Sequence, residues 1–362
     1  MKNISVAVKI AGCAAGLLVL AAVFFFGWLS LNEYRPSATE AVPVKGNAPA
    51  RVPFEKPLEL YSWNIGYAAL DAAQDFILDG GSGVRPSSRG FVENNTWAIQ
   101  SFLASRAADF VFLQEVDVNS RRSYGIDQAD YFAGSWRGTS AFALNYFCKF
   151  VPYPFPRFLG RIESGLLTLN TFYAGTQAER IALPSPFGWP VRTAQLKRCL
   201  LVERLPIADS DRELVLINLH MEAYDSGEGR AAQMRILADF LNAEYAKGNY
   251  CVAGGDFNAN FPGAEDNFPL VDTDHFMPGT IEPDSAGGVW AADSAVPSAR
   301  LLDRPYNGDR EDNQFYVIDG FLVSPNVRVD SVRTIDLDFK NSDHNPVKLT
   351  FTLPQDGADT AN

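Results

Sequence analysis

Short runs of apolar, β-branched and aromatic residues recur along the chain from residue 58 onward, bounded by Gly, Pro, Asn and Asp. Runs of this kind predict β-strands. The candidate strands span residues 58–65, 110–116, 140–147, 164–171, 198–205, 214–220, 250–258, 315–323 and 347–353. Two segments, 96–108 and 229–248, instead space their apolar residues as amphipathic helices do. Because strands outnumber helices, the pattern predicts a four-layer α/β sandwich, with two mostly antiparallel sheets face to face and helices outside.

Two long segments, 80–95 and 262–312, are rich in polar and turn-forming residues, and we predict that they are surface loops. Two shorter segments, 147–160 and 184–190, are instead rich in aromatic residues and Pro. Such a surface is typical of loops that contact a bilayer or flank a substrate. The alternative is that these aromatic residues cover the edge of a sheet.

The N-terminal part of the chain has a different pattern, because residues 10–31 contain no charged side chain. An apolar stretch of about 20 residues is long enough to cross a bilayer as a helix. A lipoprotein signal ending at Cys13 is excluded, since the apolar stretch follows this residue. A cleaved secretory signal has a shorter apolar region, of about 7 to 15 residues, and the nearest small-residue cleavage pattern, at 48–50, contains Pro. We therefore expect a retained transmembrane anchor.

The flanks of the anchor indicate its orientation. Lys2 and Lys9 precede the apolar stretch, and Arg35 and Lys45 follow it, so the basic residues are nearly balanced. The short basic N-terminus then decides the orientation. We expect residues 1–9 in the cytoplasm and the folded part outside the cell, in a single-pass protein of the cell membrane.

The composition predicts one folded domain after the anchor. The chain has 362 residues, of which 47% are hydrophobic, which excludes a disordered chain, a collagen-like fibre and a small disulfide-bonded protein. Residues 32–57 have repeated Pro and no apolar period, which predicts an extended tether that does not pack on the domain. The folded domain is expected over 58–353, followed by a flexible tail over 354–362. Its cysteines are expected to be buried thiols rather than disulfides.

Acidic residues exceed basic residues, 43 to 31, and the formal net charge is −12. Since residues 1–57 contain more basic than acidic groups, the acidic excess lies in the domain. An acidic field opposes diffuse binding to nucleic acid and to anionic lipid. It suits a cluster of carboxylates that holds divalent cations.

Polar residues stand at the ends of several strand-like runs, where each alone would be an ordinary turn former or cap. These residues are Asn64, Glu115, His220, Asp256, Asn258, Asp319, Asp343 and His344. So many buried polar groups would cost several kcal/mol each unless cations or phosphate oxygens neutralise them. Carboxylate and amide oxygens suit Mg²⁺, Mn²⁺ or Ca²⁺, and the Cys spacing matches no zinc site. The remaining histidine, His275, lies in a loop and is expected to be structural.

The strings WNIGY, FLQEVD, NLH, GGDFNAN, VIDGFLVS and SDHNPV occur in this order. They resemble the endonuclease/exonuclease/phosphatase superfamily, which includes deoxyribonuclease I-like proteins, over about residues 58–353. GGDFN and SDHNPV are the most specific of these strings. The resemblance implies a four-layer α/β sandwich with the active site at one edge of the two sheets. It also implies a divalent metal, with Mg²⁺ expected first, and hydrolysis of a phosphoester by metal-activated water with a His/Asp pair.

The resemblance implies a role for each matching residue. Asn64, Glu115 and Asp343 would form the metal site, with Glu115 as a direct carboxylate ligand.

The remaining matching residues would serve the reaction itself. Asp256 would position or deprotonate the attacking water, and Asn258 would hydrogen-bond the phosphate. Asp319 would orient the imidazole of His344, and His220 would donate to a non-bridging phosphoryl oxygen. This set supplies a positioned nucleophile and donors for the equatorial oxygens. Either His344 or metal-bound water could protonate the leaving oxygen.

Some positions near these motifs are less specific. Glu163 could brace His220 or be a solvated strand-end carboxylate. Arg230 and Gln233 are expected to serve packing and capping. Many members of the superfamily have an Arg where this chain reads LNT at 169–171, so any contact made by that Arg is in doubt.

The substrate is not given by the fold, which supports several phosphoester hydrolases. Basic residues in 121–125 and 300–310 could bind a phosphate group locally. The anchor would place the enzyme near lipid headgroups. We therefore expect a membrane-anchored phosphoesterase acting on a lipid headgroup, a nucleic acid or a small phosphoester, with a monomer as the default. An extracellular nuclease acting on DNA or RNA and a catalytically silent binding protein are the alternatives.

Overall fold

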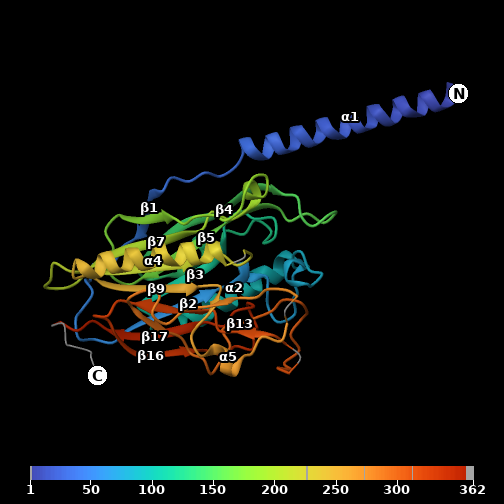
Figure 1. Ribbon diagram of the computed structural model, residues 1–362. Coiled ribbons are helices and arrows are strands. Elements are labelled where there is room, and N and C mark those ends of the chain that lie inside the picture. The colour runs from blue at the N-terminus through green and yellow to red at the C-terminus, as the bar shows by residue number, and fades with distance from the viewer. Residues whose placement is uncertain (1, 226, 273, 312, 356–362) are drawn as a thin grey trace.

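A single sheet of 13 strands forms the body of the protein (Figure 1). The computed structural model describes residues 2–225, 227–272, 274–311 and 313–355. The strand order is β12-β15-β9-β8-β7-β6-β1-β4-β5-β3-β2-β17-β16, and β10-β11 and β13-β14 form two small separate sheets. The helices are α1 (Lys2–Leu31), α2 (Arg89–Ala104), α3 (Gln128–Ser135), α4 (Glu228–Ala246) and α5 (Ala264–Asn267), with 3₁₀ turns at Gly66–Ala68, Ile77–Asp79 and Val191–Ala194.

The first strands of the chain are β1 (Thr39–Gly46), β2 (Leu58–Asn64), β3 (Phe110–Asp117), β4 (Thr139–Val151), β5 (Gly160–Asn170), β6 (Gln177–Ala182), β7 (Cys199–Pro206), β8 (Glu213–His220) and β9 (Tyr250–Asp256). The later strands are β10 (Ala259–Asn260), β11 (Gly279–Thr280), β12 (Val289–Ala291), β13 (Ala299–Arg300), β14 (Phe315–Tyr316), β15 (Asp319–Val323), β16 (Arg328–Thr334) and β17 (Val347–Thr352).

Every predicted strand is confirmed, although the run at 315–323 is divided between β14 and β15. Both predicted helices are confirmed as α2 and α4. Helix α2 begins at Arg89 because the side chain of Ser88 caps its first turn by accepting a hydrogen bond from the Phe91 backbone N–H. The prediction that 80–95 is entirely loop is therefore wrong for its second half.

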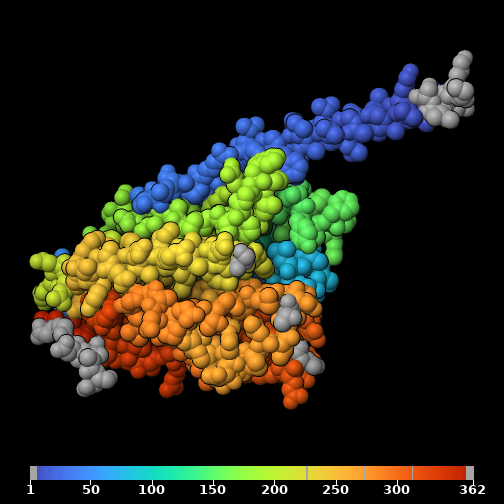
Figure 2. Space-filling model, viewed as in Figure 1, coloured from blue at the N-terminus to red at the C-terminus, as the bar shows by residue number. Residues whose placement is uncertain are grey.

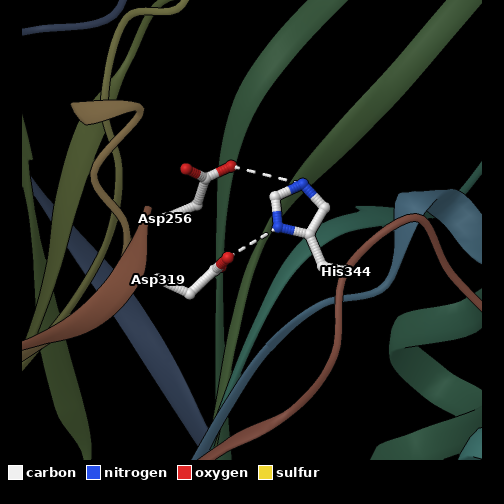
Figure 3. A group of neighbouring side chains, drawn as sticks. All are labelled: Asp256, Asp319 and His344. Atoms are coloured by element: carbon white, nitrogen blue, oxygen red, sulfur yellow. Dashed lines mark hydrogen bonds and ion pairs between the residues drawn. The ribbon is translucent and has the colours of Figure 1, made fainter. Parts of the chain in front are cut away.

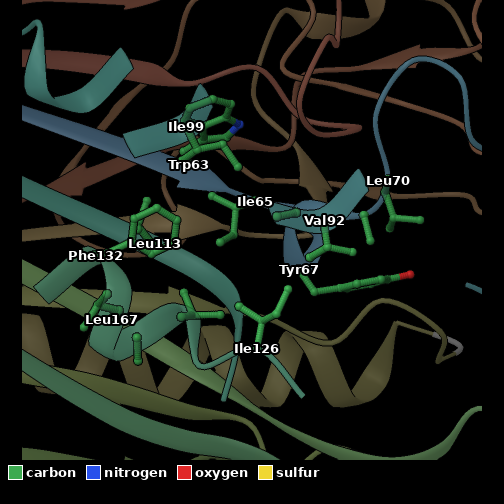
Figure 4. Close-up of a cluster of buried hydrophobic side chains, with 14 of the residues drawn as sticks. Trp63, Ile65, Tyr67, Leu70, Val92, Ile99, Leu113, Ile126, Phe132 and Leu167 are labelled. Carbon is green, nitrogen blue, oxygen red and sulfur yellow. The ribbon is translucent and has the colours of Figure 1, made fainter. Parts of the chain in front are cut away.

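The sheet folds back on itself into a nearly closed, barrel-like arrangement. Leu60 and Phe112 of one half share a buried apolar core with Leu216 and Val252 of the other half. The outer face of the first half packs against α2 and α3, and Figure 4 shows this cluster around Trp63. The outer face of the second half packs against α4. The α/β fold is thus confirmed, but the predicted pair of separate sheets is not, because one continuous sheet forms both halves.

Strand β1 joins the two halves and lies inside the segment predicted to be a tether. Its first residues pair antiparallel with β6, and its last residues, from Val44 to Gly46, pair antiparallel with β4. Val42 is buried between the sheet halves at 5% exposure. The prediction that residues 32–57 do not pack on the domain is therefore wrong for β1. The segment joins the sheet because its extended backbone then forms hydrogen bonds with β4 and β6, and its side chains alternate between buried and exposed positions.

Helix α1 leaves the body of the molecule and exposes most of its side chains (Figures 1 and 2). Its segment Val6–Leu31 is long and apolar enough to cross a membrane, with a mean hydropathy of 2.4. A signal sequence near an N-terminus has the same properties, so this helix by itself is weak evidence of an anchor. Its last turn contacts the domain, where the Trp189 side chain donates a hydrogen bond to Ser30 Oγ at 2.9 Å.

Cutting back the buried side chain of β1 should destabilise the fold. We expect Val42→Ala to lower the free energy of unfolding by about 1–3 kcal/mol, because it removes apolar area and leaves a cavity between the halves. Thr39→Ala, at an exposed position of the same strand, is the control and should stay within about 0.5 kcal/mol. Urea unfolding of the full-length protein in detergent measures both. Equal effects of the two substitutions would contradict a joining role for β1.

Candidate active site

The sheet brings the predicted site residues to one edge. Asn64 ends β2, and His220 and Asp256 end the parallel strands β8 and β9, where they are paired in register. Asp319 begins β15, which runs antiparallel to β9 and places Asp319 directly opposite Asp256. Parallel neighbours end at the same edge of a sheet, and an antiparallel neighbour begins there. The polar ends of β8, β9 and β15 therefore converge, and Asn64 reaches them from β2 in the other half of the sheet. The sequence predicts this common site.

The centre of the cluster consists of Asp256, Asp319 and His344 (Figure 3). His344 Nδ1 lies 2.7 Å from Asp319 Oδ2, which is a hydrogen bond that fixes the plane of the imidazole ring. His344 Nε2 lies 3.8 Å from Asp256 Oδ2. All three side chains are buried. Asp319 orients His344 in the arrangement implied by the sequence motifs.

Asp256 is the hub of the polar contacts. Its Oδ2 accepts a hydrogen bond from Asn64 Nδ2 at 3.0 Å and lies 3.4 Å from His220 Nε2. Its Oδ1 accepts from the backbone N–H of Asn258 at 2.9 Å. The side-chain amide of Asn258 donates to the Met221 carbonyl at 2.9 Å, so this amide holds the chain beside His220.

Two further carboxylates, those of Glu115 and Asp343, border the cluster. Glu115 has a φ of 55° at an irregularity of β3, and its Oε1 lies 3.3 Å from Asn64 Nδ2. Asp343 Oδ2 lies 3.9 Å from His344 Nε2. Gly66 leaves room for this carboxylate, since a Cβ atom there would lie 2.6 Å from Asp343 Oδ1. Its φ of +48° also favours glycine.

A family model described as the Endonuclease/Exonuclease/phosphatase family matches residues 61–344. The match begins within β2 and ends at His344, so it covers the whole cluster. The chain belongs to the endonuclease/exonuclease/phosphatase family.

Solved structures show the same fold. An endonuclease/exonuclease/phosphatase from Beutenbergia cavernae superposes with a TM-score of 0.56 at 18% identity, over 83% of this chain and 72% of that one. A family protein from Bacteroides thetaiotaomicron gives a TM-score of 0.51 at 16% identity, over 83% and 97% of the two chains. No curated protein matches this chain. At such identities the likeness shows the fold of the endonuclease/exonuclease/phosphatase family and leaves the substrate open.

Asn64, predicted as a metal-site residue, presents its amide nitrogen to the cluster. Its Oδ1 accepts a hydrogen bond from the Gly66 backbone N–H at 3.1 Å, and its Nδ2 faces the carboxylates of Glu115 and Asp256. A metal ligand would need to present its oxygen instead. In this orientation Asn64 is a hydrogen-bond donor that holds two carboxylates.

Burial and neighbouring charges shift the pKa values of the Asp and His side chains in the cluster. Burial and the nearby Asp319 raise the pKa of Asp256 to about 7, and burial raises the pKa of Asp343 to about 6. For His344, burial alone would lower the pKa, but Asp319 and Asp343 outweigh it and hold the pKa well above its ordinary value. Burial and the charge of Arg198 hold the pKa of His220 well below its ordinary value. The site therefore pairs a cationic His344 with a neutral His220.

The donor set fits a hard divalent cation. The cluster is rich in carboxylate oxygens, and Asp319 Oδ1 is buried with no hydrogen-bond partner among the residues described. The tightest acidic group is Asp256, Asp319 and His344, whose donor atoms lie within 4.8 Å of one another. His344 Nδ1 is already committed to Asp319, so we favour Glu115 and Asp343 as the side chains that would hold a cation. A cation there would favour the ionised form of Asp343, whose pKa burial raises.

Several residues that support the cluster were not singled out by sequence reasoning. Arg122 is buried, donates to both carboxylate oxygens of Asp117 at 3.1 and 2.9 Å, and lies 3.7 Å from the centroid of the Tyr67 ring. Its Nη2 lies 4.0 Å from Glu115 Oε2. Arg122 therefore lies beside Glu115 and is buried, so within 121–125 it is the exposed Arg121 that stays available for the predicted phosphate contact. The sequence did not indicate this burial, because a basic residue in a loop is usually exposed.

A second buried contact lies behind the cluster. Gln114 Nε2 donates to Asn218 Oδ1 at 2.8 Å, across the two halves of the sheet. Gln114 directly precedes Glu115, and Asn218 lies two residues before His220. A polar residue inside an apolar strand was the sequence signal that could have identified both. Arg300 lies in the segment 300–310, whose basic residues could bind phosphate according to the sequence. It is buried as well, and it donates to the backbone carbonyls of Asp71 and Gln74.

The remaining candidates lie outside the cluster. Of the two alternatives for Glu163, the contact with His220 is not seen: Glu163 pairs with Arg161, and His220 Nδ1 has no hydrogen-bond partner among the residues described. His275 pairs with Asp272 at 2.9 Å in a loop.

Arg230 and Gln233 do serve packing. Arg230 Nη1 donates to the Glu222 carbonyl, and Gln233 Oε1 accepts from the Glu222 backbone N–H. The cysteines Cys148, Cys199 and Cys251 are buried free thiols, as predicted.

Removing the carboxylate that orients His344 should change its titration. We expect Asp319→Asn to lower the pKa of His344, because burial is then no longer offset. Asp272→Asn, which removes the partner of His275, is the matched control and should leave His344 unchanged. NMR titration of the metal-free protein can follow both rings, since the chain has three histidines.

The same pair contributes a pH-dependent stability. A raised folded-state pKa stabilises the fold fully below the ordinary value of 6.5, and this gain is lost as the pH rises through the raised value. The stability lost in Asp319→Asn should therefore be largest at mildly acidic pH. An unchanged His344 titration in Asp319→Asn would show that the pair does not form.

Proposed function

We propose that this protein is a membrane-anchored, divalent-metal-dependent phosphoesterase. The observation that carries this proposal is the buried cluster in which Asp256, Asp319 and His344 meet at one edge of the sheet. Membership in the endonuclease/exonuclease/phosphatase family supports hydrolysis of a phosphoester.

In this proposal Asp256 is the general base. Its pKa of about 7 allows it to accept a proton from an attacking water near neutral pH. Asn64 and the Asn258 backbone N–H hold its two oxygens, so the carboxylate keeps a fixed orientation. A fixed base lowers the entropy cost of reaching the transition state.

The two histidines have different tasks. His344, kept cationic and oriented by Asp319, stabilises negative charge on the phosphoryl oxygens or protonates the leaving oxygen. His220 is neutral and donates a hydrogen bond to a non-bridging oxygen. Glu115 and Asp343 hold the divalent cation, which when bound neutralises phosphoryl charge.

The anchor and the charge of the chain favour a small or membrane-bound phosphoester over a long nucleic acid. Helix α1 serves as a retained membrane span in this proposal, with the domain outside the cell. The net charge of −12 opposes diffuse nucleic-acid binding. Lipid headgroups and phosphate compounds at the membrane surface are then the expected substrates.

The role of Asp256 can be tested directly. We expect Asp256→Asn to lower kcat by about 100- to 10,000-fold, the usual contribution of a general base. Asp272→Asn, an acid-to-amide change beside a histidine outside the cluster, is the control and should retain activity. The full-length protein is incubated with plasmid DNA, RNA, phosphatidylcholine vesicles and p-nitrophenyl phosphate. Cleavage of nucleic acid alone would favour a nuclease, and no cleavage of any substrate by the unmodified protein would favour a binding protein.

Metal dependence has a readout besides activity. We expect EDTA to abolish hydrolysis and Mg²⁺ or Mn²⁺ to restore it. At about 100 times its dissociation constant, Mg²⁺ should stabilise the fold by about 2.7 kcal/mol, which thermal unfolding measures. Glu115→Gln should reduce this stabilisation, whereas Glu93→Gln, on the exposed face of α2, should not. Equal stabilisation of both variants would exclude Glu115 as a ligand.

A further inference from the structure

A pocket of about 410 Å³ lies where α1 meets the domain. Residues 33–36, directly after α1, form one wall, and Leu183, Phe187 and basic residues from 192 to 198 form the other. The pocket is formed by segments far apart in the sequence, and it does not include any residue of the acidic cluster.

Positive charge is concentrated in this pocket, although the chain as a whole is acidic. Its lining contains Arg35, Arg192, Lys197 and Arg198. Glu33 is the acidic residue of the lining, and its side chain is 4% exposed.

The carboxylate of Glu33 is shared among its basic neighbours. It lies 2.9 Å from Arg35 Nη2, 3.0 Å from Lys197 Nζ and 3.4 Å from Arg192 Nε. One carboxylate cannot neutralise three cations, so positive charge remains.

Arg198 adds a buried donor to the pocket. Its side chain is 3% exposed, and its Nε has no hydrogen-bond partner among the residues described. Glu222 Oε2 lies 3.8 Å from this nitrogen, which is within ion-pair distance but beyond hydrogen-bond distance, and Arg198 Nη1 donates to the His220 carbonyl at 3.4 Å. A buried donor without an acceptor is costly, and an anion in the pocket would reduce that cost.

The position of the pocket matches the headgroup layer of a bilayer. The apolar segment of α1 ends at Leu31, two residues before Glu33. Trp189 is 59% exposed, packs edge-on against Phe26 at 5.9 Å and hydrogen-bonds Ser30 in the last turn of α1. Tryptophan is enriched at the level where the hydrocarbon meets the headgroups. In Figure 2 the end of the blue helix lies against the yellow-green segment that carries Trp189.

We propose that this pocket binds the headgroup of an anionic phospholipid from the leaflet that surrounds the end of α1. Its phosphate would contact Arg35 and Arg192, whose guanidinium groups suit bidentate phosphate binding. The acyl chains would lie along Phe26 and Trp189. This inference rests on the retained anchor of the proposed function, but not on catalysis.

Lipid binding by the full-length protein in detergent tests the proposal. Native mass spectrometry measures retention of phosphatidylglycerol, with phosphatidylcholine and inorganic phosphate as separate probes. We expect phosphatidylglycerol to bind, and Arg35→Gln/Arg192→Gln to weaken it about 25-fold, because each basic side chain near an anionic surface contributes about fivefold. This variant leaves the Lys197–Glu33 pair in place. Arg106→Gln/Arg137→Gln, at exposed positions of the domain, is the charge-matched control and should bind as the unmodified protein does.

Each outcome separates the proposal from its alternatives. Equal retention of the two lipids, or equal loss in both double variants, would overturn it. Binding of inorganic phosphate that is lost in Arg35→Gln/Arg192→Gln, without lipid binding, would also overturn it. Thermal unfolding and p-nitrophenyl phosphate hydrolysis, both expected to be unchanged in Arg35→Gln/Arg192→Gln, exclude misfolding. If Asp256→Asn binds phosphatidylglycerol while no preparation hydrolyses a phosphoester, the pocket stands and the proposed catalysis fails.

Discussion

Two carboxylates placed opposite each other on neighbouring strands are the constraint that organises this site. The register of β9 and β15 sets Asp256 beside Asp319, and both are buried. Like charges so close in a low-dielectric environment are unfavourable unless neighbours compensate them. His344 supplies a cation to both, and Asn64 donates to Asp256. A one-residue slip of either strand would turn its side chain to the opposite face and end this arrangement.

The cluster was predictable because it follows from strand ends. Asn64, His220 and Asp256 each terminate an apolar run. The adjacent strands β8 and β9 place His220 beside Asp256, and β2 in the other half of the sheet brings Asn64 to the same cluster. The features of the site that could not be predicted from the sequence depend on contacts between single atoms. The amide orientation of Asn64 is set by the backbone N–H of Gly66, and the partner of Glu163 is Arg161 on the same strand. Neither is encoded in a pattern of residue types.

Strand β1 shows the corresponding limit for the fold. It contains Pro43 and buries few side chains, so its sequence resembles a linker. Its strand conformation comes from partners far along the chain, in β4 and β6. Local propensity is a weak guide where non-local pairing decides the structure. The same holds for Arg122 and Arg300, whose charge predicts exposure but whose guanidinium groups serve buried carboxylates and carbonyls.

The connection from α1 through Glu33 into β1 affects how the domain is held relative to α1. The connection is short, because the chain enters its own sheet within eight residues of Leu31, and Glu33 forms ion pairs with the domain before that point. For a helix embedded in a bilayer, so short a connection would set the height and tilt of the edge that holds the acidic cluster. Encounters with partners would then depend on lateral diffusion in the plane, and a molecule held at another height would stay out of reach.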